Sequence, residues 1–315
     1  MNDMTQNNLE RALKIVGTRP PRPDGVDKVT GRALFGSDKS LPNMLVGRVL
    51  RSPYAHAKII SIDTSKAEVL NGVKSIVTCA DFEDFPSEFV PNGEMIVNLK
   101  DITRNIMARE KVLYVGHTVA AVAATSEDIA EKALGLIDIK YEVLPHVLEV
   151  EDAEKPDAPV LHEDMMTIGI EPSPKKASNV AKRVEFGFGD VEKGFAEADL
   201  IVEREFTTQQ VHQGYIEPHA CLASVSEDGQ ADLWCTTQGA FVVRNFCSKL
   251  LGLSAAQIKV TASEIGGGFG GKTVVYLEPL ALALSRKSGR PVKMEMSRAE
   301  VFTSSGPTSG AKVWV

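Results

Sequence analysis

The stretch from Ile258 to Pro279, IKVTASEIGGGFGGKTVVYLEP, decides the fold prediction for this chain of 315 residues. It begins as an alternating strand, enters a glycine loop around Phe269 and continues into a predicted helix. The loop glycines are Gly266, Gly267, Gly268, Gly270 and Gly271. Without a Cβ they permit positive φ and let backbone amides approach a ligand closely. A helix beginning directly after the loop would add N–H groups that favour an anion, so we predict a site for a negatively charged group.

The segment from Gly266 to Thr273 also satisfies GxxxxGK[ST], the phosphate-binding loop pattern of ATPases and GTPases. Only 42 residues follow Thr273, too few for the remaining parallel strands of such a nucleotidase. No apolar strand ending in a metal-binding Asp follows either. A nucleotidase of this type and a purely structural glycine turn are kept as alternatives.

Strands and helices alternate around the glycine loop. Periodicity predicts strands at Ala181–Phe188, Leu200–Thr207, Cys221–Val225 and Ala231–Cys235, and helices at Val191–Ala198, Ala240–Leu251 and Leu277–Ser285. Thr236, Thr237 and Gln238 directly follow one of these strands.

The N-terminal half shows the same mixture. Strands are predicted at Met44–Leu50, Lys58–Ile62, Gly72–Cys79, Thr118–Ala124 and Ile137–Tyr141. Ser126 is predicted to be the N-cap of a helix with acidic residues in its first turn. The fold class is therefore α+β, a mixed α/β architecture.

Proline-rich segments divide the chain. Thr18 to Lys28, TRPPRPDGVDK, holds three prolines, so residues 1–26 are predicted to form an extended N-terminal strap. Residues 27–148 form a first domain, 149–180 an exposed connector and 181–315 a second domain, because EDAEKPDAPV and EPSPKKAS lack periodicity.

Composition excludes several classes of function. Forty-two Asp and Glu against 35 Lys and Arg give a net charge of −7, which argues against nucleic-acid and acidic-membrane binding. No secretory signal or run of about 20 apolar residues occurs, so a cytoplasmic protein without a membrane span is expected. The four cysteines show no CxxC spacing, so neither a zinc module nor an iron–sulfur cluster is predicted.

Several separated motifs then carry a family resemblance. The glycine loop with Phe269, and the Thr236–Gln238 segment, resemble the molybdenum-binding large subunit of the xanthine dehydrogenase and aldehyde oxidase family. KTVVYLEPLALALSRKSGRPVKMEMSR and GPTSG look nearest to the carbon monoxide dehydrogenase large-subunit-like branch. KVTGRALFGSD, RSPYAHAKI, KVLYVGHTVAAVAA and YEVLP resemble the family's a/b hammerhead domain. The resemblance, from Asp27 to Val315, implies a hammerhead domain followed by the first molybdenum-cofactor-binding domain.

The resemblance also implies a cofactor and its residues. The family binds molybdenum–molybdopterin, for which the cytosine dinucleotide form is a candidate here. Gln238 matches the glutamine whose amide contacts an oxo ligand of the metal, and such an amide donates without titrating near pH 7. Phe269 and Gly270 match the pair whose backbone lines the metal's coordination sphere. Gly267, Gly268 and Gly271 complete the cofactor-binding loop, and the Phe269 ring is expected to be packed in the core, fixing the loop amides.

Two departures from the family pattern concern the substrate. Thr273 stands where many purine-oxidising members have a glutamate, which counts against xanthine-type anchoring. None of the four cysteines lies in the copper-bridging motif of the carbon monoxide oxidisers. Lys272 is either attracted to the anionic cofactor or, as readily, a surface lysine.

The implied function is that of a molybdenum-dependent oxidoreductase. It would oxidise an aldehyde or an N-heteroaromatic small molecule with water as oxygen source, and pass electrons to iron–sulfur and FAD partner subunits, whose ligands and fingerprints this chain lacks. The family's large subunit continues beyond the position of Val315, and its general-base glutamate lies there, so no catalytic residue is assigned here. We expect either a split protein completed by a second molybdopterin-domain polypeptide or a truncated product; the alternative function is a catalytically silent scaffold.

Three polar positions are interpreted as structural. Glu217, next to Pro218 and His219, is expected to be a hydrogen-bonded carboxylate beneath the cofactor rather than a catalytic group. His56 and His117 have no metal-ligand spacing and are expected to be structural.

Overall fold

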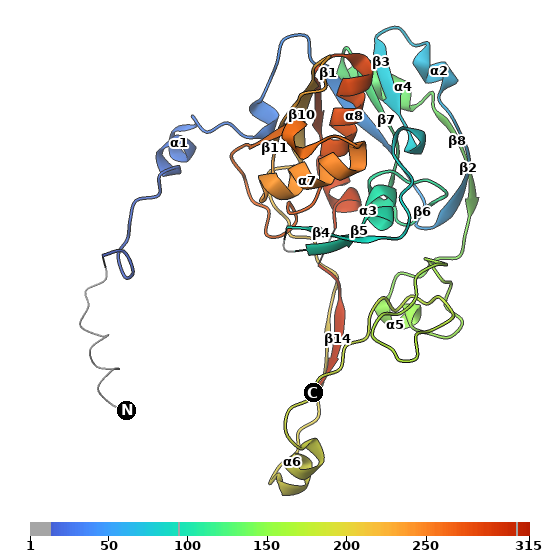
Figure 1. Ribbon diagram of the computed structural model, residues 1–315, viewed down its shortest axis with the longest axis vertical. Coiled ribbons are helices and arrows are strands. Elements are labelled where there is room, and N and C mark those ends of the chain that lie inside the picture. The colour runs from blue at the N-terminus through green and yellow to red at the C-terminus, as the bar shows by residue number, and fades with distance from the viewer. Residues whose placement is uncertain (1–13, 94, 307) are drawn as a thin grey trace.

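A mixed sheet of seven strands organises the residues that this computed structural model describes, which are 14–93, 95–306 and 308–315. Its strand order is β12-β11-β10-β13-β1-β7-β3. Figure 1 labels β1, β3, β7, β10 and β11 of this sheet. The seven strands are β1 (Leu45–Arg51), β3 (Val73–Val77), β7 (Thr118–Ala124), β10 (Ala220–Val225), β11 (Ala231–Cys235), β12 (Ile258–Ala262) and β13 (Val292–Glu295).

Strands from both halves of the chain meet in this sheet. β1 pairs in parallel with β13, with Leu45 opposite Val292, and antiparallel with β7, with Val46 opposite Ala124. One hydrogen-bonded layer therefore joins the predicted domains 27–148 and 181–315.

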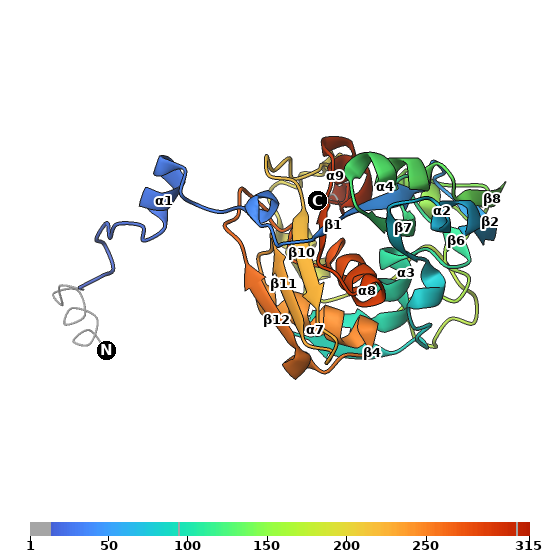
Figure 2. The same cartoon turned by 90° about the horizontal axis from the view of Figure 1, so that it is seen from above.

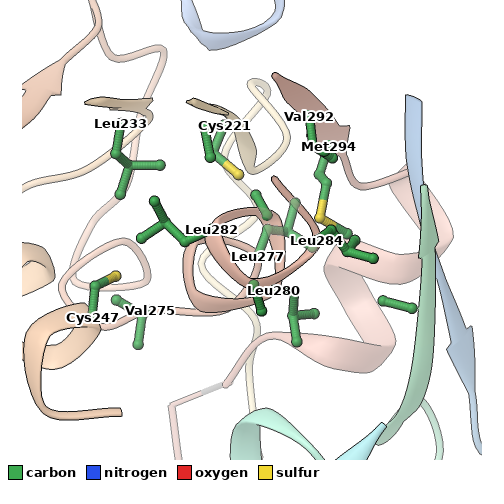
Figure 3. Packing of buried hydrophobic residues seen from close by; sticks show 14 of the residues in the cluster. Cys221, Leu233, Cys247, Val275, Leu277, Leu280, Leu282, Leu284, Val292 and Met294 are labelled. Atoms are coloured by element: carbon green, nitrogen blue, oxygen red, sulfur yellow. The ribbon is translucent and has the colours of Figure 1, made fainter. Parts of the chain in front are cut away.

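Helices cover the two faces of the sheet. α8 (Glu278–Ser288) packs on β10, β13 and β3, and α4 (Glu127–Leu134) packs on β1 and β7 (Figure 2). The larger apolar cluster is built around α8, which contributes Leu280, Leu282 and Leu284 (Figure 3).

β7 contributes to the apolar clusters on both faces of the sheet. Its residues Ala121 and Ala123 belong to the larger cluster, around α8. Ala120 and Val122 belong to the opposite cluster, which contains Ala133 of α4. Because both faces of β7 are covered, all of its residues are buried.

The remaining elements surround this core. The other helices are α1 (Gly25–Thr30), α2 (Ser65–Glu68), α3 (Leu99–Ile106), α5 (Val150–Ala153), α6 (Val191–Glu197), α7 (Ala240–Leu251) and α9 (Arg298–Ser304), with 3-10 turns at η1 (Gly36–Asp38), η2 (Cys79–Asp81) and η3 (Ala255–Gln257). Smaller sheets are formed by β2 (Ala57–Asp63) with β6 (Lys111–Val112) and β8 (Asp138–Val143), by β4 (Phe89–Asn92) with β5 (Met95–Asn98), and by β9 (Glu205–Thr208) with β14 (Ala311–Trp314).

Two segments, residues 181–211 and 308–315, leave the body of the molecule together, and we call them the arm. Figure 1 shows it extending away from the seven-stranded sheet, with the β9–β14 ribbon along its length and α6 at its far end.

The mixed α/β fold class is confirmed, and so are most predicted elements. α7 has the predicted bounds, and Ser126 caps α4 by accepting a hydrogen bond from the Ile129 amide at 3.4 Å. The strand predicted at Ala181–Phe188 is wrong, since only an isolated bridge at Lys182 forms there. Apolar alternation indicates a strand only where a surface covers one face, and this part of the arm lies exposed.

Two boundaries also differ from prediction. Residues 1–13 of the predicted strap lie outside the described residues, and α1 begins at Gly25, so the prediction of an extended chain up to residue 26 is wrong at its end. After the glycine loop the chain is irregular until α8 begins at Glu278. The helix therefore does not present its N-terminus to the loop, and the expected contribution of helix N–H groups is absent there.

Candidate functional site

The glycine loop and Gln238 lie side by side because they follow neighbouring parallel strands. β11 precedes Gln238 and β12 precedes the loop, with Cys235 opposite Ala262 in the register. Parallel strands end at the same edge of a sheet, so the segments that follow them meet there. The structure thus brings together the residues that the sequence analysis combined.

The side chain of Gln238 is oriented by the loop. Its Oε1 accepts hydrogen bonds from the amides of Gly270 at 3.0 Å and Lys272 at 3.2 Å, and its own backbone N–H donates to the Lys272 carbonyl at 2.9 Å. A Cβ at Gly268 would lie 2.6 Å from that Oε1. Because both neighbours are donors, the carbonyl end faces the loop. The Nε2 amide has no acceptor among the described residues and is left to donate to a ligand.

Three consecutive backbone amides of the loop are also free. Within the described residues, the N–H groups of Gly267, Gly268 and Phe269 have no acceptor. The loop takes positive φ at Gly267 (102°), Phe269 (49°) and Gly270 (91°). Consecutive free amides in a loop with such left-handed residues are a common feature of anion-binding sites.

Phe269 does not anchor the loop in the core. Its side chain is 75% exposed, so the prediction of a packed ring is wrong. It is also one of the non-glycine residues with positive φ, a conformation that costs energy and must be imposed by the surroundings. Other contacts therefore fix the loop.

A buried ion pair between Lys272 and Glu217 fixes the loop. The Lys272 Nζ donates to Glu217 Oε2 at 2.8 Å and to the Glu217 carbonyl at 2.9 Å. The same Oε2 accepts from the Gly266 amide at 2.7 Å, and a Cβ at Gly266 would lie 2.7 Å from the Glu217 Cβ. The carboxylate thus holds both the start and the end of the glycine loop, as the structural interpretation of Glu217 predicts.

Lys272 is completely buried at its side chain, so the alternative of a surface lysine is wrong. Burial lowers the pKa of Lys272, while the hydrogen bond and charge of Glu217 oppose this shift. Because its Nζ points inward and α8 begins several residues later, Lys272 is not placed as the lysine of a nucleotidase phosphate loop. The geometry does not support the nucleotidase alternative.

Aromatic and histidine side chains form the floor beneath the loop. The Nε2 of buried His219 lies 2.7 Å from the Tyr215 hydroxyl, which lies 3.1 Å from Ser305 Oγ. Burial, and next the charge of Lys272, lower the pKa of His219 to about 3, so this imidazole is neutral. The Tyr215 ring packs directly under the loop, where a Cβ at Gly271 would lie 2.8 Å from it.

Tyr215 and an N-terminal contact are absent from the sequence-based prediction of the site. The amide of Gly36 in η1 donates to Glu217 Oε1 at 3.4 Å, and a Cβ on Gly36 would lie 2.4 Å from Thr236. The FGSD motif that contains Gly36 belongs to the hammerhead resemblance, which does not predict a contact with the cofactor-binding domain. Its glycine is the one sequence signal that could have indicated such a close approach.

His117 and His56, which the sequence analysis interprets as structural, are both in contact with the backbone. His117 Nδ1 accepts from the Leu113 amide at 3.2 Å and its Nε2 lies 2.8 Å from the Arg104 carbonyl. His56 Nδ1 lies 2.6 Å from the Pro145 carbonyl. Across residues 14–93, 95–306 and 308–315, no group of three or more His, Cys, Asp or Glu could hold a metal ion. In the same residues, every helix is too short or too polar to cross a membrane.

Comparison with known proteins matches two regions of the chain to family models. Residues 30–145 match the model of the aldehyde oxidase and xanthine dehydrogenase a/b hammerhead domain, and residues 173–315 match that of the molybdopterin cofactor-binding domain. The chain belongs to the xanthine dehydrogenase and aldehyde oxidase family. The second match places the glycine loop and Gln238 in a molybdopterin-binding domain of this family.

Individual family members show the same similarity. A probable xanthine dehydrogenase subunit of Bacillus subtilis is 36% identical over 280 residues, which are 89% of this chain and 34% of that protein. The nicotinate dehydrogenase large molybdopterin subunit of Eubacterium barkeri is 30% identical, over 94% of this chain and 64% of that protein. The structure of reconstituted CO dehydrogenase from Oligotropha carboxidovorans superimposes with a TM-score of 0.78 at 32% identity, over 93% of this chain and 36% of that chain. This chain thus spans about a third of the Bacillus relative and less than two thirds of the Eubacterium relative.

Proposed function

We propose that this chain holds one side of the molybdenum–molybdopterin cofactor of a molybdenum hydroxylase. The observation that carries the proposal is the set of free donors: the Gln238 Nε2 beside the consecutive amides of Gly267, Gly268 and Phe269. The cofactor is anionic and carries oxo and phosphate oxygens, which are acceptors for such donors.

The residues present fit this group. Gly268 has no space for a Cβ against Gln238, whereas beside Gly270 nothing lies within 4 Å of a Cβ position. Gly268 is therefore packed against Gln238, whereas the space beside Gly270 is free for a ligand. Gln238 would donate to a metal oxo group, and the backbone of Phe269 and Gly270 would line the metal. When bound, the cofactor supplies the redox chemistry of the family.

The other residues of the site keep the donors in place. The Lys272–Glu217 ion pair holds both ends of the loop, and neutral His219 with Tyr215 supports it from below. A site whose donors are fixed before binding loses less free energy in ordering them.

The proposed substrate class is an aldehyde or an N-heteroaromatic compound, oxidised with water as oxygen source. Two similar proteins are named for xanthine and nicotinate, which supports the heteroaromatic class. Thr273 donates to the Gly270 carbonyl at 2.8 Å, so its hydroxyl is used within the loop. We therefore do not expect xanthine-type anchoring at this position.

We further propose iron–sulfur and FAD subunits as electron acceptors, and a second molybdopterin-domain polypeptide that carries the general-base glutamate. The cytosine dinucleotide form of the cofactor and a cytoplasmic location stay predictions of the sequence. So do the boundaries of the domains 27–148 and 181–315, which the matched ranges 30–145 and 173–315 support.

Cofactor content of the purified complex tests this proposal. In Gly268→Ala the new Cβ displaces the Gln238 carboxamide, and Gln238→Ala removes it. We expect molybdenum and pterin per chain, measured by elemental analysis and by fluorescence of the oxidised pterin, to fall about tenfold or more in both variants.

Gly239→Ala is the matched control. It lies next to Gln238, but its Cβ would come no closer than 3.4 Å to Val242, so the cofactor content should stay that of the wild type. Unchanged content in both test variants would contradict the proposal. A wild-type complex that assembles without molybdenum or pterin would instead favour the silent scaffold.

A further inference from the structure

A cavity of about 460 Å³ lies between α3, β6 and the segment that follows α5. Its walls come from three parts of the chain, within residues 101–105, 109–117 and 162–164. Figure 1 shows α3 and β6 side by side. The volume is in the range of small-molecule sites. Neither Gln238 nor the glycine loop lines this cavity, so it is separate from the site described above.

The outer wall of the cavity is held in place by two lysines. Lys111 Nζ donates to the Leu161 carbonyl at 2.5 Å and to the Glu163 carboxylate at 2.7 Å. Lys100 on α3 forms an ion pair with Asp164. The segment after α5 is therefore connected to both β6 and α3, and the cavity between them has a fixed wall.

One part of the cavity is apolar and aromatic. Ile102, Leu113 and Tyr114 line it, and the Tyr114 ring stacks on the His117 ring with 4.5 Å between the ring centres. Burial lowers the pKa of His117 to about 4, so the imidazole beneath the tyrosine is neutral. This surface can hold the apolar body of a ligand, and an aromatic ring also attracts a cation.

The basic side chains of the cavity are engaged within the protein. Arg109 donates to two backbone carbonyls at 2.9 and 2.7 Å, and Arg104 pairs with Glu110 at 3.1 Å. The Nε of Arg104 has no acceptor among the described residues, but it is shielded from solvent. The side chains of Arg104, Arg109 and Lys111 are between 17% and 30% exposed. They offer little free positive charge to a ligand.

The acidic side chains of the cavity are accessible instead. Those of Glu110, Glu163 and Asp164 are between 55% and 73% exposed. Asp101, in the first turn of α3, is exposed, and no basic side chain within residues 14–93, 95–306 and 308–315 pairs with it. The charge that a ligand meets in this cavity is therefore negative.

We infer that this cavity binds a small organic amine in its protonated form, with the ammonium group on Asp101 and the apolar body against Ile102, Leu113 and Tyr114. An ammonium group and a free carboxylate form a charge-assisted hydrogen bond. An anion of the same size would meet the exposed carboxylates without a free cation to bind it. The inference does not depend on the cofactor proposed above.

Three probes with the same aromatic body and different charge test this inference. Benzylammonium, benzyl alcohol and benzoate are titrated calorimetrically into the full chain at about 0.15 M salt, where attraction between distant exposed charges is screened. Benzylammonium should bind about tenfold or more tightly than the other two, because it alone carries the charge that the carboxylates attract.

Asp101→Asn tests the position of the ammonium group. The substitution keeps the size of the side chain and removes its charge, so benzylammonium should bind about tenfold more weakly. Glu227→Gln is the matched control, because Glu227 is exposed in the turn between β10 and β11 and the variant has the same net charge. It should bind benzylammonium like the wild type. Both changes are at exposed positions, so both variants should keep the wild-type urea midpoint.

Three results would overturn the inference. Benzylammonium might produce no heat of binding with the wild type, or benzoate might bind as tightly as benzylammonium. Equal weakening by Asp101→Asn and Glu227→Gln would show that the amine responds to the net charge of the protein and not to the cavity.

Discussion

At the scale of single residues, the Lys272–Glu217 pair controls the shape of the glycine loop. Removing the lysine leaves a carboxylate whose side chain is only 10% exposed without its cation. We predict that Lys272→Met lowers the free energy of unfolding by about 3–5 kcal/mol, the usual effect of breaking a buried pair from one side. Urea denaturation followed by circular dichroism measures it.

The double variant Glu217→Gln/Lys272→Met is the control for this prediction. It removes both charges, so a large part of the lost stability should return. A single-variant effect below about 1 kcal/mol, the value of an exposed pair, would show that the two side chains are hydrated.

The second residue-scale prediction concerns pH. Burial lowers the pKa of His117 to about 4 from 6.5, so between these values the unfolded chain binds a proton that the folded chain does not. The contribution of neutral His117 to the free energy of unfolding is therefore complete above pH 6.5 and is lost as the pH falls toward 4. Between pH 7 and pH 5 the loss is about 2 kcal/mol, from about 1.4 kcal/mol per pKa unit.

Denaturation at the two pH values tests this, with His117→Gln as the comparison. The variant lacks the titrating ring, so its stability should fall by about 2 kcal/mol less than that of the wild type. An equal fall in both proteins would mean that His117 is already hydrated in the folded chain.

The hydrogen-bond donors of the site can be predicted from the sequence, because the residues that supply them lie in two short segments with recognisable patterns. The loop glycines and Gln238 follow adjacent strands, and the missing side chains of the loop are visible in the sequence. The burial of Lys272 cannot be predicted in this way, because its partner Glu217 lies 55 residues away along the chain. The prediction for Phe269 is wrong for a related reason: an aromatic residue usually packs inward, but here the ion pair already holds the loop.

At the scale of secondary structure, β7 is buried on both faces, so its side chains have little room to become larger. Its alternate residues contact different apolar clusters, with Ala123 on one side and Ala120 on the other. Ala123→Leu should lower the free energy of unfolding by about 1–3 kcal/mol, because the added atoms overpack a filled core.

The matched control for β7 is Ala311→Leu on β14, where the side chain is exposed and should change stability by less than about 0.5 kcal/mol. Both are measured by thermal and urea unfolding. A neutral Ala123→Leu would indicate unfilled space between β7 and α8.

Helices whose capping residues and apolar periodicity are visible in the sequence can be predicted. A segment whose apolar pattern has no surface to pack on is predicted wrongly. α4 has Ser126 and an acidic first turn, and α7 has a regular apolar stripe ending at Gly252. Residues 181–188 carry alternating apolar residues with nothing to cover them, so the pattern does not produce a strand. The β1–β13 pairing joins distant segments, which local patterns do not encode.

At the scale of the whole molecule, the sheet makes one cooperative unit of two sequence regions. β1 lies between β13 and β7, so neither region can unfold without breaking hydrogen bonds to the other. We predict a single unfolding transition for the sheet. In Trp314→Phe, the remaining tryptophan is Trp234 on β11, and its fluorescence should report the same midpoint as circular dichroism. Two separated midpoints would contradict this.

The parallel pairing of β1 with β13 also affects how the chain is made. β1 leaves the ribosome about 240 residues before β13, a delay of roughly ten to fifty seconds at ordinary rates of translation. During that interval the edge of β1 has no strand beside it, and exposed edges are where chains aggregate. Chaperone protection of the nascent chain would matter most in this window.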